Sequence, residues 1–508
     1  MGIPSYFNYI LKNHHNIIVK KPQVSSDNLF VDANSLIYDT INDYDGKIPD
    51  NLKTIFQDIY NNILKLVKNV NPKEKSYICL DGVPPVAKIM QQKQRRFKGT
   101  LINKILTSKT PSSFNRNQIT PGSSFMNQLD DYLYKAFSSH ANIVFSGSCI
   151  PMEGEHKICK IISSDENFKQ KNSIVYGLDA DLFMLGLLMV FKEYNIFLFK
   201  ETKHFSYIKG IDEKEFYYFN INTFSHQLSQ KLQVNRKQSI CDYCLLAFLC
   251  GNDFLPHLHS INIRNEGIPY IIDKYLELNK DKNNKKPLVN IETGNINWRN
   301  FRDYIATIAR EEKDKIFQNL SWKISQKNKI KPLSESDKLD LLPCVDNEKE
   351  IHLYNNIEEF EDFIFHDVNI KSVSKNYVEM IEWTWYYYFH NDVIDDTKYY
   401  CYSKAPLLST CLPFIPLFND DVILNSRKTD RIAETTLLLY VIPFHEHKQL
   451  IDIDKNNTNF WSIYNKIPQL RETNFEIDYF LCKFFWEGHL NIPHIDIFHL
   501  NNIIMDSV

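Results

Sequence analysis

Short apolar runs that end at or near an acidic residue recur along the first half of the chain. Four of them are rich in Val, Ile, Phe and Tyr, which predicts buried strands over residues 27–32, 76–81, 141–148 and 173–181. A fifth run, 244–253, predicts a helix that leads into a loop. Helical periodicity lies between the runs, for example over 51–69 and 125–139. The alternation predicts an α/β fold with a mostly parallel central sheet flanked by helices.

Polar stretches divide the rest of the chain. Residues 278–287 predict a surface loop or linker, and the polar region 323–350 precedes a part with helical periodicity. No uncharged apolar run is long enough to span a bilayer, and the N-terminus lacks the features of a signal peptide. We therefore expect no membrane partner and an intracellular, cytoplasmic location, with the nucleus as the alternative.

Seven acidic residues follow the predicted strands or the fifth run. They are Asp32, Asp81, Glu153, Glu155, Asp179, Asp181 and Asp253. A single such residue is usually a helix cap or turn former, but the strand ends of a parallel sheet meet at one edge, where ligands bind. Carboxylates gathered there repel one another unless cations neutralise them, and hard oxygen ligands favour Mg²⁺ or Mn²⁺. The pattern indicates metal-assisted phosphoryl chemistry, with two ions near one another.

Basic residues are concentrated in one segment although the whole chain has a net charge of −3. Residues 82–129 contain no Asp or Glu, and their cations are Lys88, Lys93, Arg95, Arg96, Lys98, Lys104, Lys109 and Arg116. Within this segment, 86–97 predicts an amphipathic helix that packs on the sheet through its apolar side. Its polar arc carries Lys88, Gln92, Arg95 and Arg96, a set suited to a terminal phosphate. Because the helix begins soon after Asp81, we expect this phosphate pocket beside the metals.

Several segments together resemble the XRN family of 5′→3′ exoribonucleases. The matching segments are MGIPSYFNYI (1–10), NLFVDANSLIYD (28–39), LDGVPPVAKIMQQKQRRF (80–97), ITPGSSFM (119–126), PMEGEHKI (151–158), YGLDADLFMLGL (176–187) and LCGNDFLPHL (249–258). They occur in the family's order, and YYYFHND (386–392) and KAP (404–406) extend the similarity into the C-terminal half.

The resemblance implies a PIN/flap-nuclease-like core and assigns roles to the residues above. The seven acids would surround the metals, and Lys88, Gln92, Arg95 and Arg96 would bind the 5′-phosphate. The implied partner is single-stranded RNA with a 5′-monophosphate, degraded stepwise to 5′-mononucleotides in RNA and mRNA decay. The implied organisation is a catalytic α/β domain over 1–275, a linker and variable segment over 276–350, and a mainly helical second conserved region over 351–508.

The sequence departs from the family pattern at the clamp for the first base. Members use a His shortly after the first metal-binding Asp and a Trp before a Tyr-Tyr pair. Here Tyr38 stands at the His position and Lys398 at the Trp position, beside Tyr399 and Tyr400. Tyr38 can stack on a base, and Tyr399 is the candidate substitute for the Trp. The resemblance is to a compact member, which we expect to lack the additional C-terminal domains of the large cytoplasmic members.

Two other functions fit parts of the pattern. A flap-endonuclease-like DNA nuclease shares the acidic site but carries a glycine-rich hairpin after the last acids, whereas here no glycine follows Asp253 until Gly267. A catalytically inactive RNA-binding homologue would have lost some acids, and all seven are present. The aromatic run 383–389 predicts core rather than a base-stacking platform. His156 and Lys157 could contact phosphate or lie on a helix surface, and Cys241 and Cys244 predict a buried pair rather than a zinc site.

Overall fold

The fold is given by a computed structural model, which describes most of the chain. The described residues are 3, 5–21, 24–44, 48–106, 114–177, 179–200, 217–281, 283–326, 359–366, 368–450, 460–482 and 487–506. Several parts of the predictions lie outside them: Lys109 of the basic segment, residue 178 of the predicted strand 173–181, residues 282 and 327–350 of the expected linker, and residues 351–358, 367, 451–459, 483–486 and 507–508 of the expected second region.

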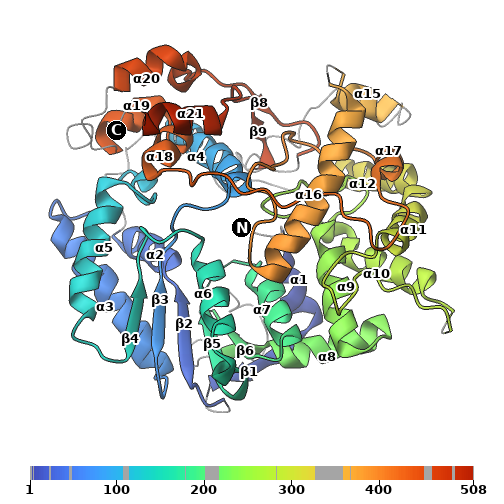
Figure 1. Cartoon of the computed structure of the whole chain (residues 1–508), viewed down its shortest axis with the longest axis horizontal. Helices are drawn as coiled ribbons and strands as arrows, with labels where there is room; N and C mark the ends of the chain where they lie inside the picture. The colour runs from blue at the N-terminus through green and yellow to red at the C-terminus, as the bar shows by residue number, and fades with distance from the viewer. Residues whose placement is uncertain are drawn as a thin grey trace.

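Among these residues a seven-stranded sheet forms the central layer (Figure 1), in the order β1-β7-β6-β5-β2-β3-β4. The strands are β1 (Ile18–Lys20), β2 (Asn28–Asp32), β3 (Ser76–Cys79), β4 (Ile143–Ser146), β5 (Asn172–Tyr176), β6 (Asn195–Phe199) and β7 (Tyr217–Asn220). Strands β6, β5, β2, β3 and β4 are parallel, and β7 is antiparallel to both of its neighbours. The predicted mostly parallel sheet is confirmed.

Helices cover both faces of the sheet. On one face lie α2 (Asn34–Asp43), α3 (Leu52–Val70) and α5 (Ser124–Phe137), and on the other lie α6 (Gly154–Ser163), α7 (Leu182–Phe191), α8 (Ile221–Leu232) and α9 (Arg236–Phe248), together with α1 (Tyr6–Asn13). Successive side chains of a strand point to opposite faces. Leu29 and Val31 of β2 therefore pack with α2 and α3, whereas Phe30 packs on the opposite side with Ile158 of α6.

Helix α4 (Val86–Leu106) is longer than the predicted helix, and its apolar side does not pack on the sheet as expected. Val86 and Ile89 instead contact a cluster that contains Leu437 and Leu438 of α18 (Glu434–Val441). The remaining C-terminal elements are α19 (Phe444–Leu450), α20 (Phe460–Lys466), β8 (Ile477–Asp478), β9 (His489–Leu490) and α21 (Ile497–Met505). In Figure 1 helices α18 to α21 gather around α4 at the top of the molecule. The C-terminal residues thus bury the apolar side that the sequence assigned to the sheet.

The middle of the chain is helical. It contains α10 (Gly267–Leu278), α11 (Trp298–Ala309), α12 (Glu312–Gln326), α15 (Phe360–Ile364), α16 (Ile370–His390) and α17 (Leu408–Cys411). Helices α11 and α12 lie inside 276–350, and the division into a catalytic domain, a linker segment and a second conserved region stays a prediction. The fifth apolar run forms the end of α9 and a loop, as predicted, and Cys241 and Cys244 are buried in α9. Within the described residues no helix is both long and apolar enough to cross a membrane.

Candidate active site

The structure brings all seven predicted acids to one edge of the sheet. Asp32 is the last residue of β2, Asp81 follows β3, and Asp179 and Asp181 follow β5. Glu153 and Glu155 stand at the start of α6, which follows β4. Asp253 lies in the loop after α9. It is close to Glu153, since the Lys88 ammonium group contacts both carboxylates. The side chains that share this edge come from five separate segments of the chain.

Asp32 and Asp81 meet at the first turn of α6. The backbone N–H of Gly154 donates to Asp81 Oδ1 at 2.7 Å, and a Cβ at position 154 would lie 2.6 Å from Asp32 Oδ1. Only glycine allows this close approach of a carboxylate to the helix backbone. Asn34 of α2 holds the other oxygen of Asp81, donating from Nδ2 to Oδ2 at 2.7 Å. These contacts fix both carboxylates relative to the helix that carries Glu153 and Glu155.

The local environment disfavours ionisation of several acids. Burial and the neighbouring carboxylates of Asp81 and Asp179 raise the pKa of Asp32 well above its ordinary value. Burial and the neighbouring carboxylate of Glu153 likewise raise the pKa of Glu155 well above its ordinary value. Burial and the carboxylate of Asp253 raise the pKa of Asp181 to about 7. Among the described residues, buried Asp32 Oδ1 and Glu155 Oε2 have no hydrogen-bond partner. Unpaired, mutually repelling carboxylate oxygens of this kind fit the donor set that divalent cations require.

Lys88 is the cation placed directly among the acids. Its Nζ lies 2.6 Å from Asp253 Oδ2 and also contacts Glu153 Oε1, and the side chain is buried. Burial alone would lower the pKa of Lys88, but the carboxylates of Asp253 and Glu153 raise it well above its ordinary value. The structure therefore puts the basic helix beside the acids, as expected, with Lys88 already engaged by two of them.

The other predicted phosphate-binding residues line α4 next to Lys88. Gln92 and Arg96 are buried, and their Oε1 and Nε atoms respectively have no partner among the described residues. Arg96 donates from Nη1 to Asn117 Oδ1 at 3.3 Å and from Nη2 to the Ile119 carbonyl at 3.2 Å. Burial lowers the pKa of Arg96 to about 10, with Tyr38 acting in the opposite direction. Half-buried Arg95 acts electrostatically on both Arg96 and Asp253.

Tyrosines of α16 reach the acids, which the sequence did not predict. The aromatic run is largely core, as expected: Trp383, Trp385, Tyr387 and Tyr388 are buried. Yet the Tyr387 hydroxyl donates to Glu153 Oε2 at 3.2 Å, and the Tyr388 hydroxyl bonds Asp181. Their residue type is the feature that could have identified them. A buried tyrosine hydroxyl needs a polar partner, and the acids offer one.

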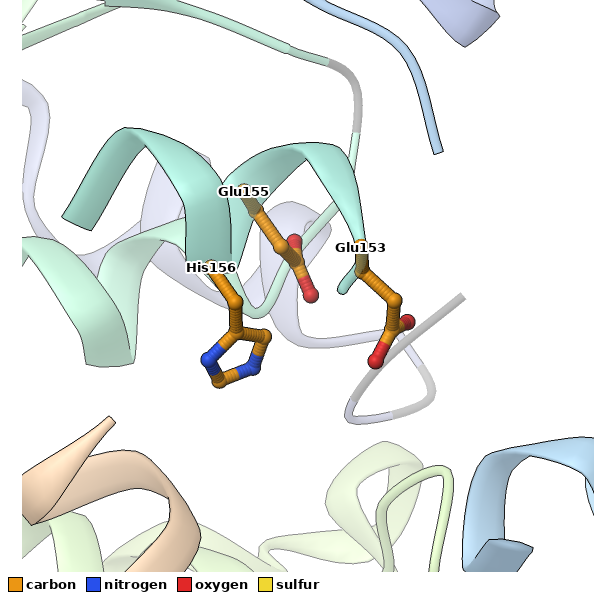
Figure 2. A group of neighbouring side chains, drawn as sticks. All are labelled: Glu153, Glu155 and His156. Atoms are coloured by element: carbon orange, nitrogen blue, oxygen red, sulfur yellow. The ribbon is translucent and has the colours of Figure 1, made fainter. Parts of the chain in front are cut away.

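His156 and Lys157 are buried, so the helix-surface interpretation of both is wrong. Lys157 donates to the carbonyls of Leu80 and Gly147 and so ties together the ends of β3 and β4. The His156 ring stacks on Tyr387 with centroids 4.0 Å apart. Figure 2 shows His156, Glu155 and Glu153 leaving the start of α6 on the same side. One ligand atom from each lies within 4.8 Å of the others, so this group could hold a metal ion.

The residues at the positions expected to clamp the first base lie in different environments from one another. Tyr38 of α2 is half-buried and close enough to Arg96 to influence its charge. Lys398, at the position where Trp was expected, pairs with Glu379 of α16 at 2.7 Å. The Tyr399 hydroxyl hydrogen-bonds His494 Nε2 at 2.9 Å, and the two rings are stacked.

Family models match two stretches of the chain. The model described as XRN 5′-3′ exonuclease N-terminus matches residues 1–202, and the model described as Xrn1 helical domain matches residues 233–340. The first stretch includes six of the seven acids and all four predicted phosphate-binding residues. The second includes Asp253.

Curated relatives are similar over much of the chain. The human protein named 5′-3′ exoribonuclease 1 is 27% identical over 498 residues, covering 80% of this chain and 29% of its own length. The Saccharomyces cerevisiae protein of the same name is 29% identical over 315 residues, covering 54% and 21%. This chain thus spans less than a third of either relative. A solved structure of the catalytic core of Rad2 in complex with DNA substrate aligns with a TM-score of 0.36 and 14% identity, over 81% of this chain and 94% of that one.

Proposed function

Because the chain belongs to the XRN family of 5′-3′ exonucleases, we propose that it is a 5′→3′ exoribonuclease. It would hydrolyse single-stranded RNA with a 5′-monophosphate stepwise to 5′-mononucleotides. The observation that carries this proposal is the contact of Lys88, on the basic helix α4, with Glu153 and Asp253 of the acidic group. A phosphate-binding helix in contact with the acids is the arrangement that cleavage near a 5′ end requires. The corresponding cellular role is RNA decay, including mRNA decay, in the cytoplasm.

The proposed cofactors are two Mg²⁺ or Mn²⁺ ions held by Asp32, Asp81, Glu153, Glu155, Asp179, Asp181 and Asp253. The unpartnered oxygens of Asp32 and Glu155 and the raised pKa values of these two carboxyl groups support this assignment. When bound, such ions supply Lewis-acid activation of water and neutralise charge on the phosphodiester. A protein that must bury so many carboxylates at one edge otherwise pays a large electrostatic cost.

The residues of α4 would bind and orient the 5′ end. Arg95 and Arg96 offer guanidinium groups that match a phosphate, and Gln92 adds an amide donor. A terminal phosphate would compete with Glu153 and Asp253 for the ammonium of Lys88. Tyr38, near Arg96, would stack on the first base. Together these contacts would place the first phosphodiester beside the acids.

The direct test is an analysis of products from one RNA carrying in turn a 5′-monophosphate, triphosphate, cap or hydroxyl. With Mg²⁺ we expect mononucleotides released from the 5′ end of the monophosphorylated RNA only. Asp179→Asn should abolish hydrolysis while RNA binding persists, because the substitution removes a proposed metal ligand but leaves α4 intact. Internal fragments, faster cleavage of flapped DNA, or full turnover by Asp179→Asn would contradict the proposal.

A further inference from the structure

His156 occupies a position inside the molecule rather than on the surface of α6. Its ring is stacked on Tyr387 and meets Tyr388 edge-on at 5.8 Å. Ring Nδ1 lies 2.5 Å from Oδ1 of Asn391, the residue that follows the last residue of α16. Two aromatic rings and one amide therefore hold the imidazole in a single orientation.

The hydrogen bonds of Asn391 determine which ring nitrogen carries the proton. Asn391 Nδ2 donates to the His156 backbone carbonyl at 2.9 Å, which leaves Oδ1 facing the ring. Since an amide oxygen only accepts, Nδ1 of His156 must be the donor. In the neutral ring the lone pair then belongs to Nε2. A histidine that binds a metal typically donates its other ring N–H to an oxygen in this manner.

Nε2 is on the side of the ring that faces Glu155 and Glu153 (Figure 2). The three side chains offer ligand atoms that lie within 4.8 Å of one another. Buried Glu155 Oε2 has no hydrogen-bond partner among the described residues. Glu153 accepts from Tyr387 and Lys88, but each carboxylate oxygen has two lone pairs, so both contacts leave capacity for a cation.

We propose that Nε2 of His156 is a metal ligand together with Glu153 and Glu155, so that this site binds Mn²⁺ in preference to Mg²⁺. Carboxylates alone suit Mg²⁺, whereas an imidazole nitrogen favours transition-metal ions. The inference rests on the proposed metal-dependent function, which it deepens by assigning a nitrogen ligand and a metal preference. Asn391 and Tyr387 are positioning residues in this arrangement, because they act on the ion only through the His156 ring.

Pulsed electron paramagnetic resonance of Mn²⁺ bound to the full chain tests the ligand directly. At one equivalent of Mn²⁺ or less, we expect modulation from a directly coordinated ¹⁴N nucleus. His156→Gln should lose this modulation, while His226→Gln, at an exposed position of α8, should retain it. A wild-type spectrum without coordinated nitrogen would overturn the proposal, and so would modulation that persists in His156→Gln. The wild-type spectrum decides the matter even if the buried substitution prevents folding.

Competition between Mn²⁺ and Mg²⁺, followed by calorimetry, gives the metal preference. His156→Gln should lower the ratio of Mn²⁺ to Mg²⁺ affinity by about tenfold, with the Mg²⁺ affinity little changed. An unchanged ratio would contradict the proposal. An RNA hydrolysis assay on the same samples separates the two hypotheses. If the protein hydrolyses RNA but its Mn²⁺ spectrum shows no nitrogen modulation, only the assignment of His156 as a ligand is wrong. If the modulation is present but RNA is not hydrolysed, only the proposed function is wrong.

Discussion

At Lys88 a buried ammonium group stands between carboxylates from two distant parts of the chain. Glu153 and Asp253 are both buried, and both touch Nζ. Buried charges are tolerated when they are paired, and removing one partner leaves the others uncompensated. Lys88 therefore has a structural role in the metal-free protein in addition to any contact with RNA.

Replacing Lys88 with Met should destabilise the metal-free protein by about 3–5 kcal/mol, because two buried carboxylates lose their counter-charge. Urea unfolding in EDTA measures this loss, and Mg²⁺ should recover part of it by neutralising the same acids. Lys237→Met is the matched control, since Lys237 forms an exposed pair with Glu193 and its loss should change little. Equal effects of the two substitutions would show that the pairing of Lys88 is unimportant.

The residues that could be predicted from the sequence are those with a local signal. The sequence indicates the acids because each one ends or follows an apolar run. It indicates Arg95 and Arg96 because they lie on the same arc of one predicted helix. Contacts between distant segments could not be predicted. Tyr387 and Glu153 are 234 positions apart, and His156 and Asn391 are 235 apart. Only the packing of α16 against α6 creates these pairs.

At the scale of elements, Asp242 joins α9 to α10 and to the segment before α11. Its Oδ1 accepts from the N–H groups of Leu288 and Val289, both at 3.0 Å, and from Gln238 Nε2 at 2.9 Å. Its Oδ2 accepts from the Tyr275 hydroxyl at 2.6 Å. Burial raises the pKa of Asp242 to about 7, although these hydrogen bonds act in the opposite direction.

The raised pKa of Asp242 makes stability depend on pH. Below the ordinary value of 3.8 both the folded and unfolded states hold the proton, so its contribution is fully present there. As pH rises towards about 7 the unfolded state releases the proton first, and the free energy of unfolding falls until the folded state also ionises. Asp242→Asn should lack this component while keeping its partners, because Nδ2 can donate to Tyr275. Urea unfolding of both proteins from pH 4 to 8 should show the wild type losing stability relative to the variant, and parallel curves would contradict the assignment.

Helix α19 is linked to the basic helix through a short loop. Glu446 of α19 accepts from the side-chain amides of Asn115 and Asn117, both at 2.7 Å, and Asn117 in turn accepts from Arg96. Thr100 of α4 also donates to Glu446, at 3.1 Å. The orientation of a proposed phosphate-binding guanidinium therefore depends on a carboxylate 350 positions later in the chain.

Glu446→Ala should raise KM for 5′-monophosphorylated RNA several-fold, because Asn117 would no longer be held in place to orient Arg96. RNA with a 5′-hydroxyl should bind almost as before, since it lacks the group that Arg96 would contact. Steady-state kinetics and binding measurements on the two RNAs check this difference. Glu472→Ala, at an exposed position, serves as the control. A uniform loss on both RNAs would indicate a general structural role for Glu446.

Helices and strands can be predicted from this sequence where the pattern of apolar residues is regular. Strands β2 to β4 and helices α3 and α5 lie close to the expected ranges because their apolar patterns are regular, whereas β5 ends at Tyr176 and not at 181. Strands β1, β6 and β7 were not predicted, because none of them leads to an acidic residue of the site; β1 and β7 are also only three and four residues long. The apolar side of α4 was assigned to the wrong partner, because a helical pattern shows which side is buried but not against what.

For the molecule as a whole, the residues after position 430 complete the environment of the basic helix. Ile432, Leu437 and Leu438 pack against Val83, Val86 and Ile89, while Lys88 of the same helix contacts Glu153 and Asp253. One helix is thus held between two parts of the chain. A substitution in the C-terminal packing should therefore change binding at the proposed 5′-phosphate site, although the substituted residue does not contact that site.

Leu437→Ala removes a fully buried side chain from this contact and should cost about 2–5 kcal/mol of stability. Because α4 would then be less firmly positioned, KM for 5′-monophosphorylated RNA should rise even at temperatures well below unfolding. Thermal unfolding and steady-state kinetics at a low temperature measure the two effects separately. Leu417→Ala is the matched control, since that side chain is 59% exposed and should change neither quantity. If Leu437→Ala lowers stability but leaves KM unchanged, the C-terminal helices cover α4 without positioning it, and the proposed coupling between the two parts of the molecule is wrong.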